Sequence, residues 1–281
     1  MHSQRPEPIH GLATDAAGEC VVALRAEAMN TPDSADVYVL EFRNRGGKEF
    51  RLSSRERVVT ASDTVYGLLP LVDSSRRQVA VGLSTSSGVT WYGAPDLIPR
   101  AEPGPKSPLP PTTHLRLRIL GYGGESTFTF QGGSVSWEGN RAYIGWMPDP
   151  APGFTVFTPL VAWLVASPSQ VELAGLHDNA ALYWTEVTRP LNQPLTTRTL
   201  TFVVPGGFRA ITIWRPGQVA GVTATNRVLW LRTRGGRFEE WALGVEVPTV
   251  ARAVACFPSR STNELLVVLE DGHLARIPVP A

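Results

Sequence analysis

The residues best suited to acid–base or metal chemistry are scattered along the chain instead of being grouped in motifs. The chain has five histidines, and none is spaced from another histidine or a cysteine as metal ligands are. His177-Asp178 and Asp271-Gly272-His273 fall at corresponding turns of two similar segments, where solvated turn residues are expected more often than a shared active site. No phosphate-binding loop, dinucleotide-binding glycine motif or Gly-x-Ser-x-Gly sequence occurs. We therefore expect no catalytic residue, no cofactor and no bound metal.

Two similar basic segments are the strongest candidates for partner binding. Residues 42–48 and 231–237 match over seven positions and share the core Arg-x-Arg-Gly-Gly. A Gly-Gly pair supplies the positive φ that a tight turn between two strands needs. Arginines at such turns either stay solvated or meet an acidic partner. The candidate partner-binding residues are Arg43, Arg45, Lys48, Arg232, Arg234 and Arg237.

A glycine and a tryptophan nine residues apart recur along the chain. A hairpin explains the spacing: an apolar strand ends near the glycine, a few small or polar residues turn, and a second strand carries the aromatic residue. The tryptophans could form a stacking surface for sugars or bases, but aromatic residues at equivalent sites more commonly pack between repeats. The pairs are Gly82 and Trp91, Gly175 and Trp184, and Gly221 and Trp230, with Val268 and Ile277 and also Gly145 and Phe154 at the same spacing.

The distance between these hairpins predicts the fold. Gly175 and Gly221 are 46 residues apart, and Gly82 and Gly175 are 93 apart, which is two such units. Apolar runs lie before and after each hairpin, so each unit has four short strands. Four strands in 40 to 50 residues are typical of a β-propeller blade. We expect an all-β chain whose residues 1–281 form a single β-propeller of about six, or five to seven, four-stranded blades.

The blade boundaries follow from the same pattern. In the second blade we expect Leu115–Leu120 to be the last strand, reached after a proline-rich surface insertion at 93–113. The third unit is irregular and too short for a full blade, so either it lacks its outer strand or the register assigned to it is wrong. The last blade ends at its third strand, so its open edge could accept a strand from a partner. The expected units are 9–54, 58–120, 126–157, 158–205, 206–247 and 248–281.

Composition narrows the function classes. The 281 residues include 26 Lys and Arg and 25 Asp and Glu, so the formal net charge is +1. This balance argues against nucleic acid or an anionic membrane as the partner. Cys20 and Cys256 lie in apolar runs and are expected to be buried free thiols. We see no signal peptide and no apolar stretch long enough to cross a membrane, so we expect a cytoplasmic protein.

Two resemblances bear on these repeats. The segment Ser84-x-Ser86-x-Gly88-x-Thr90-Trp91 resembles the Asp-box of sialidase-type propellers, but Ser86 replaces the aspartate and the equivalent hairpins lack the pattern. Because that box is structural, it implies no sialidase. The Arg-rich chain with degenerate blades also resembles the propeller component of bacterial MoxR–vWA–β-propeller ternary systems. That resemblance implies a scaffold or target-recognition module working with a MoxR-type ATPase and a von Willebrand A-domain protein.

The sequence thus favours a noncatalytic protein-interaction scaffold, with one or more proteins as partners. The alternative is a propeller enzyme or binding protein for a carbohydrate or small metabolite, using loops that face the channel. A third possibility is that the proline-rich insertion docks into a groove of another protein. The acids that an enzyme would draw on are Asp63, Asp73, Asp178 and Asp271.

Overall fold

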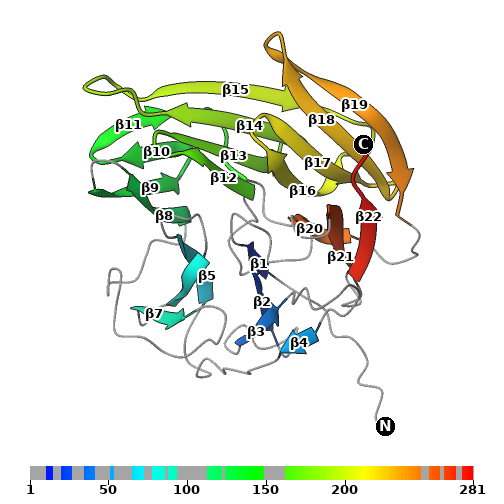
Figure 1. Ribbon diagram of the computed structural model, residues 1–281, viewed down its shortest axis with the longest axis horizontal. Helices are drawn as coiled ribbons and strands as arrows, with labels where there is room; N and C mark the ends of the chain where they lie inside the picture. Colours follow the sequence, from blue (N-terminus) through cyan, green and yellow to red (C-terminus); the bar gives the residue numbers. More distant parts are fainter. Residues whose placement is uncertain are drawn as a thin grey trace.

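The computed structural model describes the chain as a series of antiparallel strands (Figure 1). It describes residues 124–148 and 162–247 without interruption, and elsewhere individual strand segments between residues 11 and 280. Before residue 117 the description is of the backbone alone. The described segments outside the two continuous stretches are 11–14, 20–26, 35–41, 51–53, 65–72, 78–85, 88–93, 113–121, 253–259, 263–269 and 274–280.

The described strands form six sheets in chain order, four with four strands and two with three. The first sheet consists of β1 (Gly11–Thr14), β2 (Cys20–Ala26), β3 (Ala35–Glu41) and β4 (Arg51–Ser53). The second consists of β5 (Val65–Val72), β6 (Gln78–Thr85) and β7 (Gly88–Gly93). The third consists of β8 (Thr113–Gly121), β9 (Gly124–Gln131), β10 (Ser134–Trp137) and β11 (Asn140–Tyr143).

The last three sheets have the same up-and-down order. The fourth consists of β12 (Ala162–Ser167), β13 (Gln170–His177), β14 (Ala181–Thr188) and β15 (Thr196–Phe202). The fifth consists of β16 (Phe208–Arg215), β17 (Gln218–Thr223), β18 (Arg227–Arg234) and β19 (Arg237–Glu246). The sixth consists of β20 (Ala253–Ser259), β21 (Glu264–Leu269) and β22 (Leu274–Pro278).

The sheets are arranged around a common centre, as Figure 1 shows. The first strands of neighbouring sheets contact one another: β1 with β5, β5 with β8, β12 with β16, and β16 with β20. At the periphery the fourth strands β15 and β19 also meet. Each sheet therefore packs face to face with the next, and consecutive residues of a strand alternate between the two faces because side chains along a strand point to opposite sides.

The core of the described region lies between neighbouring sheets. One cluster joins the third and fourth sheets and includes Trp137 and Trp146. A second joins the fourth and fifth sheets around Trp184, and a third joins the fifth and sixth around Trp230. All four indoles are almost completely buried. The large aromatic residues thus serve packing between sheets, where they bury the most apolar surface.

The predicted boundary between the second and third units is wrong. Leu115–Leu120 does not end the second sheet, because β8 pairs with β9 in a hairpin that runs from Leu115 opposite Phe130 to Gly121 opposite Gly124. The third sheet is a regular four-stranded unit, and its last hairpin turns at Glu138 and Gly139. Gly145 follows β11 instead of ending a strand, and Phe154 lies outside the described residues.

The strands of the other units lie where they were expected. The fourth and fifth sheets fall within 158–205 and 206–247, and the last described strand of the sixth sheet is its third, β22. The number of blades, about six, stays a prediction, as does the surface insertion, since residues 94–112 lie outside the described part. Cys256 is a buried free thiol as predicted, and burial raises its pKa; the side chain of Cys20 is not described.

Candidate functional site

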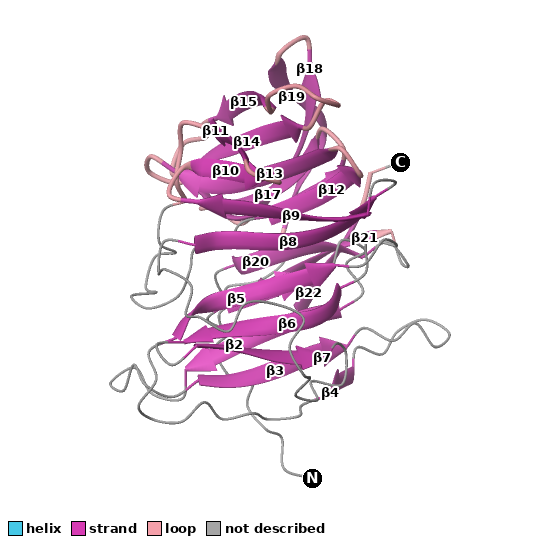
Figure 2. Ribbon diagram, turned by 90° about the vertical axis from the view of Figure 1, so that its left-hand side faces the viewer, coloured by secondary structure: helices cyan, strands magenta, loops and turns pink. Residues whose placement is uncertain are grey.

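The hairpin of β18 and β19 projects from the rest of the molecule. Its tip stands clear of the other sheets at the top of both Figure 1 and Figure 2. The two residues between the strands, Gly235 and Gly236, have φ values of 58° and 79°. Positive φ at both central positions matches the right-handed twist of the flanking strands, so the Gly-Gly pair forms the tight turn predicted from the sequence.

Three arginines surround this tip, and one glutamate partly balances them. Arg232 Nε donates to Glu239 Oε1 at 2.5 Å, and Arg234 lies 3.6 Å from the same oxygen. The hydrogen bond from Arg232 is the main cause of a lowered pKa at Glu239. The Arg234 side chain is 72% exposed, and no ion pair found in the described part of the chain includes Arg237. The tip therefore carries a local excess of positive charge.

Phe238 fixes the base of this hairpin to the neighbouring sheet. Its ring, only 8% exposed, contacts Trp184 edge-on at 6.0 Å between centroids and Phe202 at 6.3 Å. Aromatic pairs in this geometry contribute about 0.5–1.5 kcal/mol beyond the area they bury. Phe238 directly follows Arg237, so the backbone that carries the arginines is held in place. Their side chains extend from it into solvent.

For the first basic segment, residues 42–48, the structure describes only the strands on either side. Arg43, Arg45 and Lys48 lie outside the described residues. The strands on either side, β3 and β4, are the third and fourth of their sheet and pair with each other. The turn at Gly235 and Gly236 lies at the same place between β18 and β19, with residues 231–234 in β18 and Arg237 at the start of β19. The structure thus brings together the second set of predicted residues, and it shows only equivalent flanking strands for the first.

The repeated glycines and tryptophans occupy hairpins, although the nine-residue spacing is not itself a register. Gly82 lies opposite Trp91. Trp184 and Trp230 lie opposite Ala174 and Ala220, one residue before the repeated glycine. The two described tryptophans are fully buried, so their rings offer no stacking surface.

The repeated glycines make room for neighbouring aromatic rings. A Cβ atom on Gly175 would lie 2.4 Å from the ring of Trp146, which follows the last strand of the preceding sheet. A Cβ on Gly221 would lie 2.6 Å from the ring of Phe208 on β16. Real Cβ atoms do not approach other atoms so closely, so both positions require glycine for packing.

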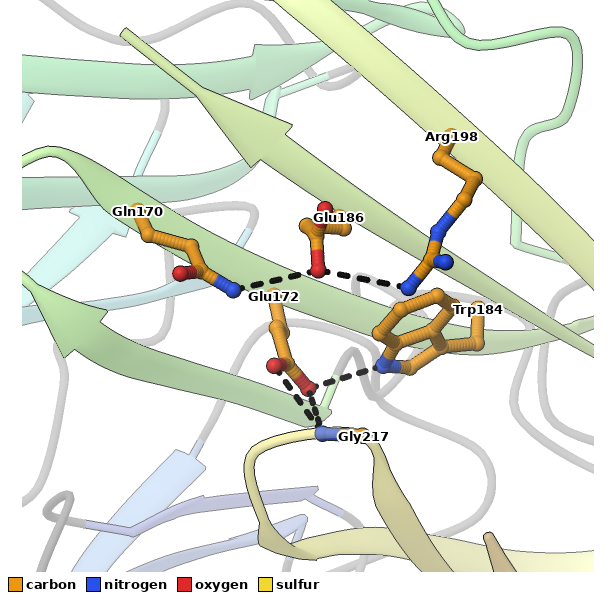
Figure 3. A network of polar contacts seen from close by, with 6 residues as sticks. All are labelled: Gln170, Glu172, Trp184, Glu186, Arg198 and Gly217. Atoms are coloured by element: carbon orange, nitrogen blue, oxygen red, sulfur yellow. Dashed lines mark hydrogen bonds and ion pairs between the residues drawn. The ribbon is translucent and has the colours of Figure 1, made fainter. Parts of the chain in front are cut away.

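A buried carboxylate links the fourth and fifth sheets, and the sequence reasoning missed it. Glu172 on β13 is 0% exposed and accepts hydrogen bonds from Trp184 Nε1 at 2.9 Å and from the backbone N–H of Gly217 at 2.9 and 3.0 Å (Figure 3). Gly217 lies in the turn between β16 and β17 of the next sheet. The sequence does carry a signal, since Glu172 is the one acidic residue in an otherwise largely apolar strand.

Burial dominates the electrostatics of Glu172. It raises the pKa of this carboxyl to about 7, against the opposing effect of the hydrogen bonds from Gly217 and Trp184. Glu186 raises it further, and Arg198 lowers it. Arg198 is paired with Glu186 at 3.4 Å and lies over the Trp184 ring at 5.4 Å, and Gln170 donates to Glu186 at 3.1 Å. A carboxyl with such a pKa suits proton transfer, but a substrate cannot reach this one, so we regard Glu172 as a structural link.

A second polar link joins the third and fourth sheets. Trp146 Nε1 donates to Thr185 Oγ1 at 2.8 Å, and the hydroxyls of Thr185 and Thr199 are hydrogen-bonded to each other at 2.8 Å. Thr199 in turn donates to the carbonyl oxygen of Ile144 at 3.2 Å. The chain of hydrogen bonds therefore returns to the segment after β11 where it began, and it ties two sheets together through side chains.

The described region includes one of the four predicted acids, so it does not test whether they come together. Asp178 lies in that region, whereas Asp63, Asp73 and Asp271 fall outside it. Asp178 accepts a hydrogen bond from Tyr183 at 2.6 Å and lies 3.3 Å from His177. Among the described residues no group of three His, Cys, Asp or Glu side chains is placed to hold a metal ion, and no helix is long and apolar enough to cross a membrane.

Comparison with known proteins shows the fold. No protein-family model matches the sequence, and no curated protein matches it. The β-propeller domain of Cps50 (Swd1) from Myceliophteria thermophila superposes with a TM-score of 0.51 at 10% identity, over 97% of this chain and 84% of that one. U3-55K gives a TM-score of 0.47 at 10% identity, over 95% and 80% of the two chains. A chain in the mitotic checkpoint complex gives 0.46 at 10% identity, over 97% and 90%.

The superposition on Cps50 and the antiparallel four-stranded sheets together define the class of fold. The chain is an all-β protein with the fold of a β-propeller. At 10% identity the likeness shows the fold and nothing further about what the chain does.

Proposed function

We propose that the chain is a noncatalytic protein-interaction scaffold and that its projecting β18–β19 hairpin contacts an acidic segment of a partner protein. The observation that carries this proposal is the placement of three arginines and a single balancing glutamate on a tip that stands clear of the sheets and is anchored by Phe238. A guanidinium presents a planar fork of donors that matches carboxylates, so an acidic peptide is the fitting chemistry.

The near-neutral charge of the whole chain supports a protein as the partner. With a formal net charge of +1, the molecule lacks the broad positive field with which proteins attract nucleic acid or anionic membranes. The positive charge at the tip is local, and local charges of this kind select and orient a partner more than they add affinity. A cytoplasmic location and a second basic contact at Arg43, Arg45 and Lys48 belong to the same proposal.

A charge reversal tests the tip. We would replace Arg234 with Glu, purify the tagged chain together with its partners from the native host, and quantify each partner. Arg234→Glu should reduce recovery of the partner several-fold, because a rim charge of the wrong sign slows association. Arg141→Glu on β11 is the matched control, since that arginine is also exposed and lies on another sheet. Equal recovery with both variants, or no stable partner of the unmodified chain, would contradict the proposal.

The partners themselves are proposed from the resemblance to MoxR–vWA–β-propeller ternary systems. In such a system the propeller would present targets to a MoxR-type ATPase with the help of a von Willebrand A-domain protein. Co-expression of the chain with the ATPase and A-domain proteins encoded beside it, followed by size-exclusion chromatography, tests this arrangement. If the three proteins elute as separate species, the proposal of a ternary system is wrong. That result would not affect the proposal that the β18–β19 hairpin binds an acidic partner.

A further inference from the structure

The turn between β16 and β17 connects the buried carboxylate to the arginine-bearing hairpin. Gly217 in this turn donates its backbone N–H to the two oxygens of Glu172, at 3.0 and 2.9 Å (Figure 3). The carbonyl oxygen of Gly217 accepts the backbone N–H of Thr233 at 2.8 Å. Thr233 belongs to β18 and lies between Arg232 and Arg234. A single residue of the fifth sheet therefore bonds both to the carboxylate and to the strand that carries two of the arginines.

Close packing makes this connection stiff. Gly217 has a φ of 68°, and a Cβ atom on it would lie 2.7 Å from Oγ1 of Thr233. Real Cβ atoms do not approach other atoms so closely, so the backbone of the turn lies directly against the Thr233 side chain. Because close-packed groups transmit displacements to one another, a shift of the turn has to move Thr233 as well.

A second route reaches the other strand of the hairpin. Trp184 donates its indole N–H to Glu172 at 2.9 Å. The ring of Trp184 contacts Phe238 on β19 edge-on at 6.0 Å between centroids. Phe238 lies directly opposite Thr233 in the pairing of β18 with β19. The carboxylate is thus connected to both strands of the hairpin, through Gly217 to β18 and through Trp184 to β19.

The protonation state of Glu172 changes the strength of both connections. An ionised carboxylate makes charge-assisted hydrogen bonds, about twice as strong as neutral ones, whereas a protonated carboxyl offers a neutral carbonyl oxygen and carries a hydrogen on the other oxygen. Because burial raises the pKa of Glu172 to about 7, both forms are present near neutral pH. Burial of the ionised form lowers the stability of the whole fold, but within the folded chain this form holds Gly217 and Trp184 more tightly.

Two charged side chains face Glu172 from its own sheet. Glu186 on β14 raises its pKa and Arg198 on β15 lowers it, and these two are paired with each other at 3.4 Å. Strand β12 contains no titratable residue. On β16, which packs against β13, Arg209 donates to a backbone carbonyl oxygen and Arg215 is exposed. The fifth sheet thus reaches the carboxylate with a backbone N–H, and the charges that tune it come from the fourth sheet.

We propose that Glu172 is a positioning residue for the arginines of the β18–β19 hairpin, and that loss of its proton fastens the hairpin and strengthens binding of an acidic partner. A hairpin that is held in one position presents its guanidinium groups in a fixed arrangement, so less freedom is lost on binding. The consequence for binding rests on the proposed function, whereas the coupling of Glu172 to the hairpin does not depend on it.

Amide chemical shifts test the coupling. In the isotope-labelled full chain, the amides of Gly217 and Thr233 should titrate together with a midpoint of about 7, since one donates to the carboxylate and the other to the carbonyl of Gly217. In Glu172→Gln both amides should lose this titration. The amide of Arg141 on β11, in another sheet, is the internal control and should not follow it.

Glu186→Gln is the matched control variant. It removes a carboxylate of the same network that is bound by Gln170 and Arg198. The titration at Gly217 and Thr233 should persist with a lower midpoint, because Glu186 raises the pKa of Glu172. Circular dichroism and the melting temperature establish that each variant is folded.

Binding of an acidic peptide tests the consequence for function. The probe is a fluorescently labelled synthetic peptide of alternating glutamate and glycine, whose carboxylates stay ionised above about pH 5.5. The guanidinium groups at the tip stay charged and the pKa of Glu239 is lowered, so these groups keep their charge while Glu172 titrates. We expect binding to be at least about fivefold tighter at about pH 8.5 than at about pH 5.5, as for a typical coupling between two sites. At both pH values Glu172→Gln should bind as weakly as the unmodified chain does at the lower one.

The sign of this change separates positioning from the effect of charge alone. A negative charge on Glu172 would by itself repel an acidic peptide and weaken binding at the higher pH. The proposal is wrong if the peptide binds equally or more weakly there, or if the Gly217 amide titrates and the Thr233 amide does not. If the two amides titrate together but the peptide binds at neither pH, or binds Arg234→Glu as well as the unmodified chain, the positioning role is supported and the acidic-partner function is wrong.

Discussion

Both oxygens of the Glu172 carboxylate accept the backbone N–H of Gly217, at 3.0 and 2.9 Å, across the boundary between two sheets. One of these oxygens also accepts the indole N–H of Trp184. A carboxylate at 0% exposure is costly unless its hydrogen bonds are made, so this contact both needs and enforces the alignment of the two sheets. Neighbouring blades are therefore joined by specific polar links in addition to apolar packing.

Replacing Trp184 with Phe should destabilise the chain more than replacing Trp230 with Phe. The two tryptophans are equivalent in the repeat and equally buried, but of the two only Trp184 donates a hydrogen bond within the described structure, to Glu172. We expect the free energy of unfolding to differ by about 1–3 kcal/mol between the variants, because Trp184→Phe removes one of the two donors that a buried carboxylate has among the described residues and leaves it the N–H of Gly217. Urea unfolding at neutral pH measures this difference. Equal losses in the two variants would show that the Glu172 contact contributes nothing.

The stability of the chain should fall as the pH rises from about 4.5 to about 7. Burial raises the pKa of Glu172 from 4.5 to about 7 in the folded chain, so between these values the folded state holds a proton that the unfolded state has released. This contribution is fully present below pH 4.5 and is lost above pH 7. Its size is about 3 kcal/mol from the linkage relation.

The variant Glu172→Gln isolates this contribution. Its amide oxygen can still accept a hydrogen bond, and its side chain does not titrate. The difference in free energy of unfolding between this variant and the unmodified chain should therefore change across pH 4.5–7 and be flat outside that window. A difference that is constant with pH would contradict the raised pKa.

Gly175→Ala should destabilise the chain through a clash with Trp146. The added Cβ would lie 2.4 Å from the indole ring, and a packed core usually loses about 1–3 kcal/mol when a methyl group is forced into it. Thermal unfolding measures the loss. The double variant Gly175→Ala with Trp146→Leu should lose less than the sum of the single variants, because the smaller side chain relieves the clash. Simple additivity would show that the two residues do not compete for space.

The Cys256 thiol should be unreactive in the folded chain. It is buried, and burial raises its pKa, so the reactive thiolate is disfavoured. In a Cys20→Ser background, a colorimetric thiol reagent at about pH 8 should label Cys256 only as fast as the chain unfolds, and urea should release one equivalent at once. Rapid labelling without urea would contradict the burial of this side chain.

The strands could be predicted from the sequence, but their partners could be predicted only in part. Leu115–Leu120 shows the period of two that marks a strand, yet that pattern does not say whether the strand closes one sheet or opens the next. The hairpin turn between Gly121 and Gly124 decides it in favour of the next sheet. The Gly235-Gly236 turn was predictable because tight turns constrain φ locally.

The polar links between sheets could not be predicted from the sequence, for a different reason. Glu172 is connected to Gly217, 45 residues away, through the packing of two sheets, and no local pattern encodes that distance. The cation-rich tip was recognisable as a match between two segments. That it projects from the molecule became visible only in the structure (Figure 2).

The links from Trp146 to Thr185 and from Glu172 to Gly217 also bear on how the molecule responds to force. Repeat architectures resist pulling through the coupling between neighbouring units as well as through each unit alone. Hydrogen-bonded side chains bridge the third, fourth and fifth sheets in series, so these three sheets should rupture together in a single event. At the interface of the fifth and sixth sheets, the buried indoles of Trp230 and Trp241 find no acceptor among the described residues. We therefore expect this interface to separate first when the chain is pulled.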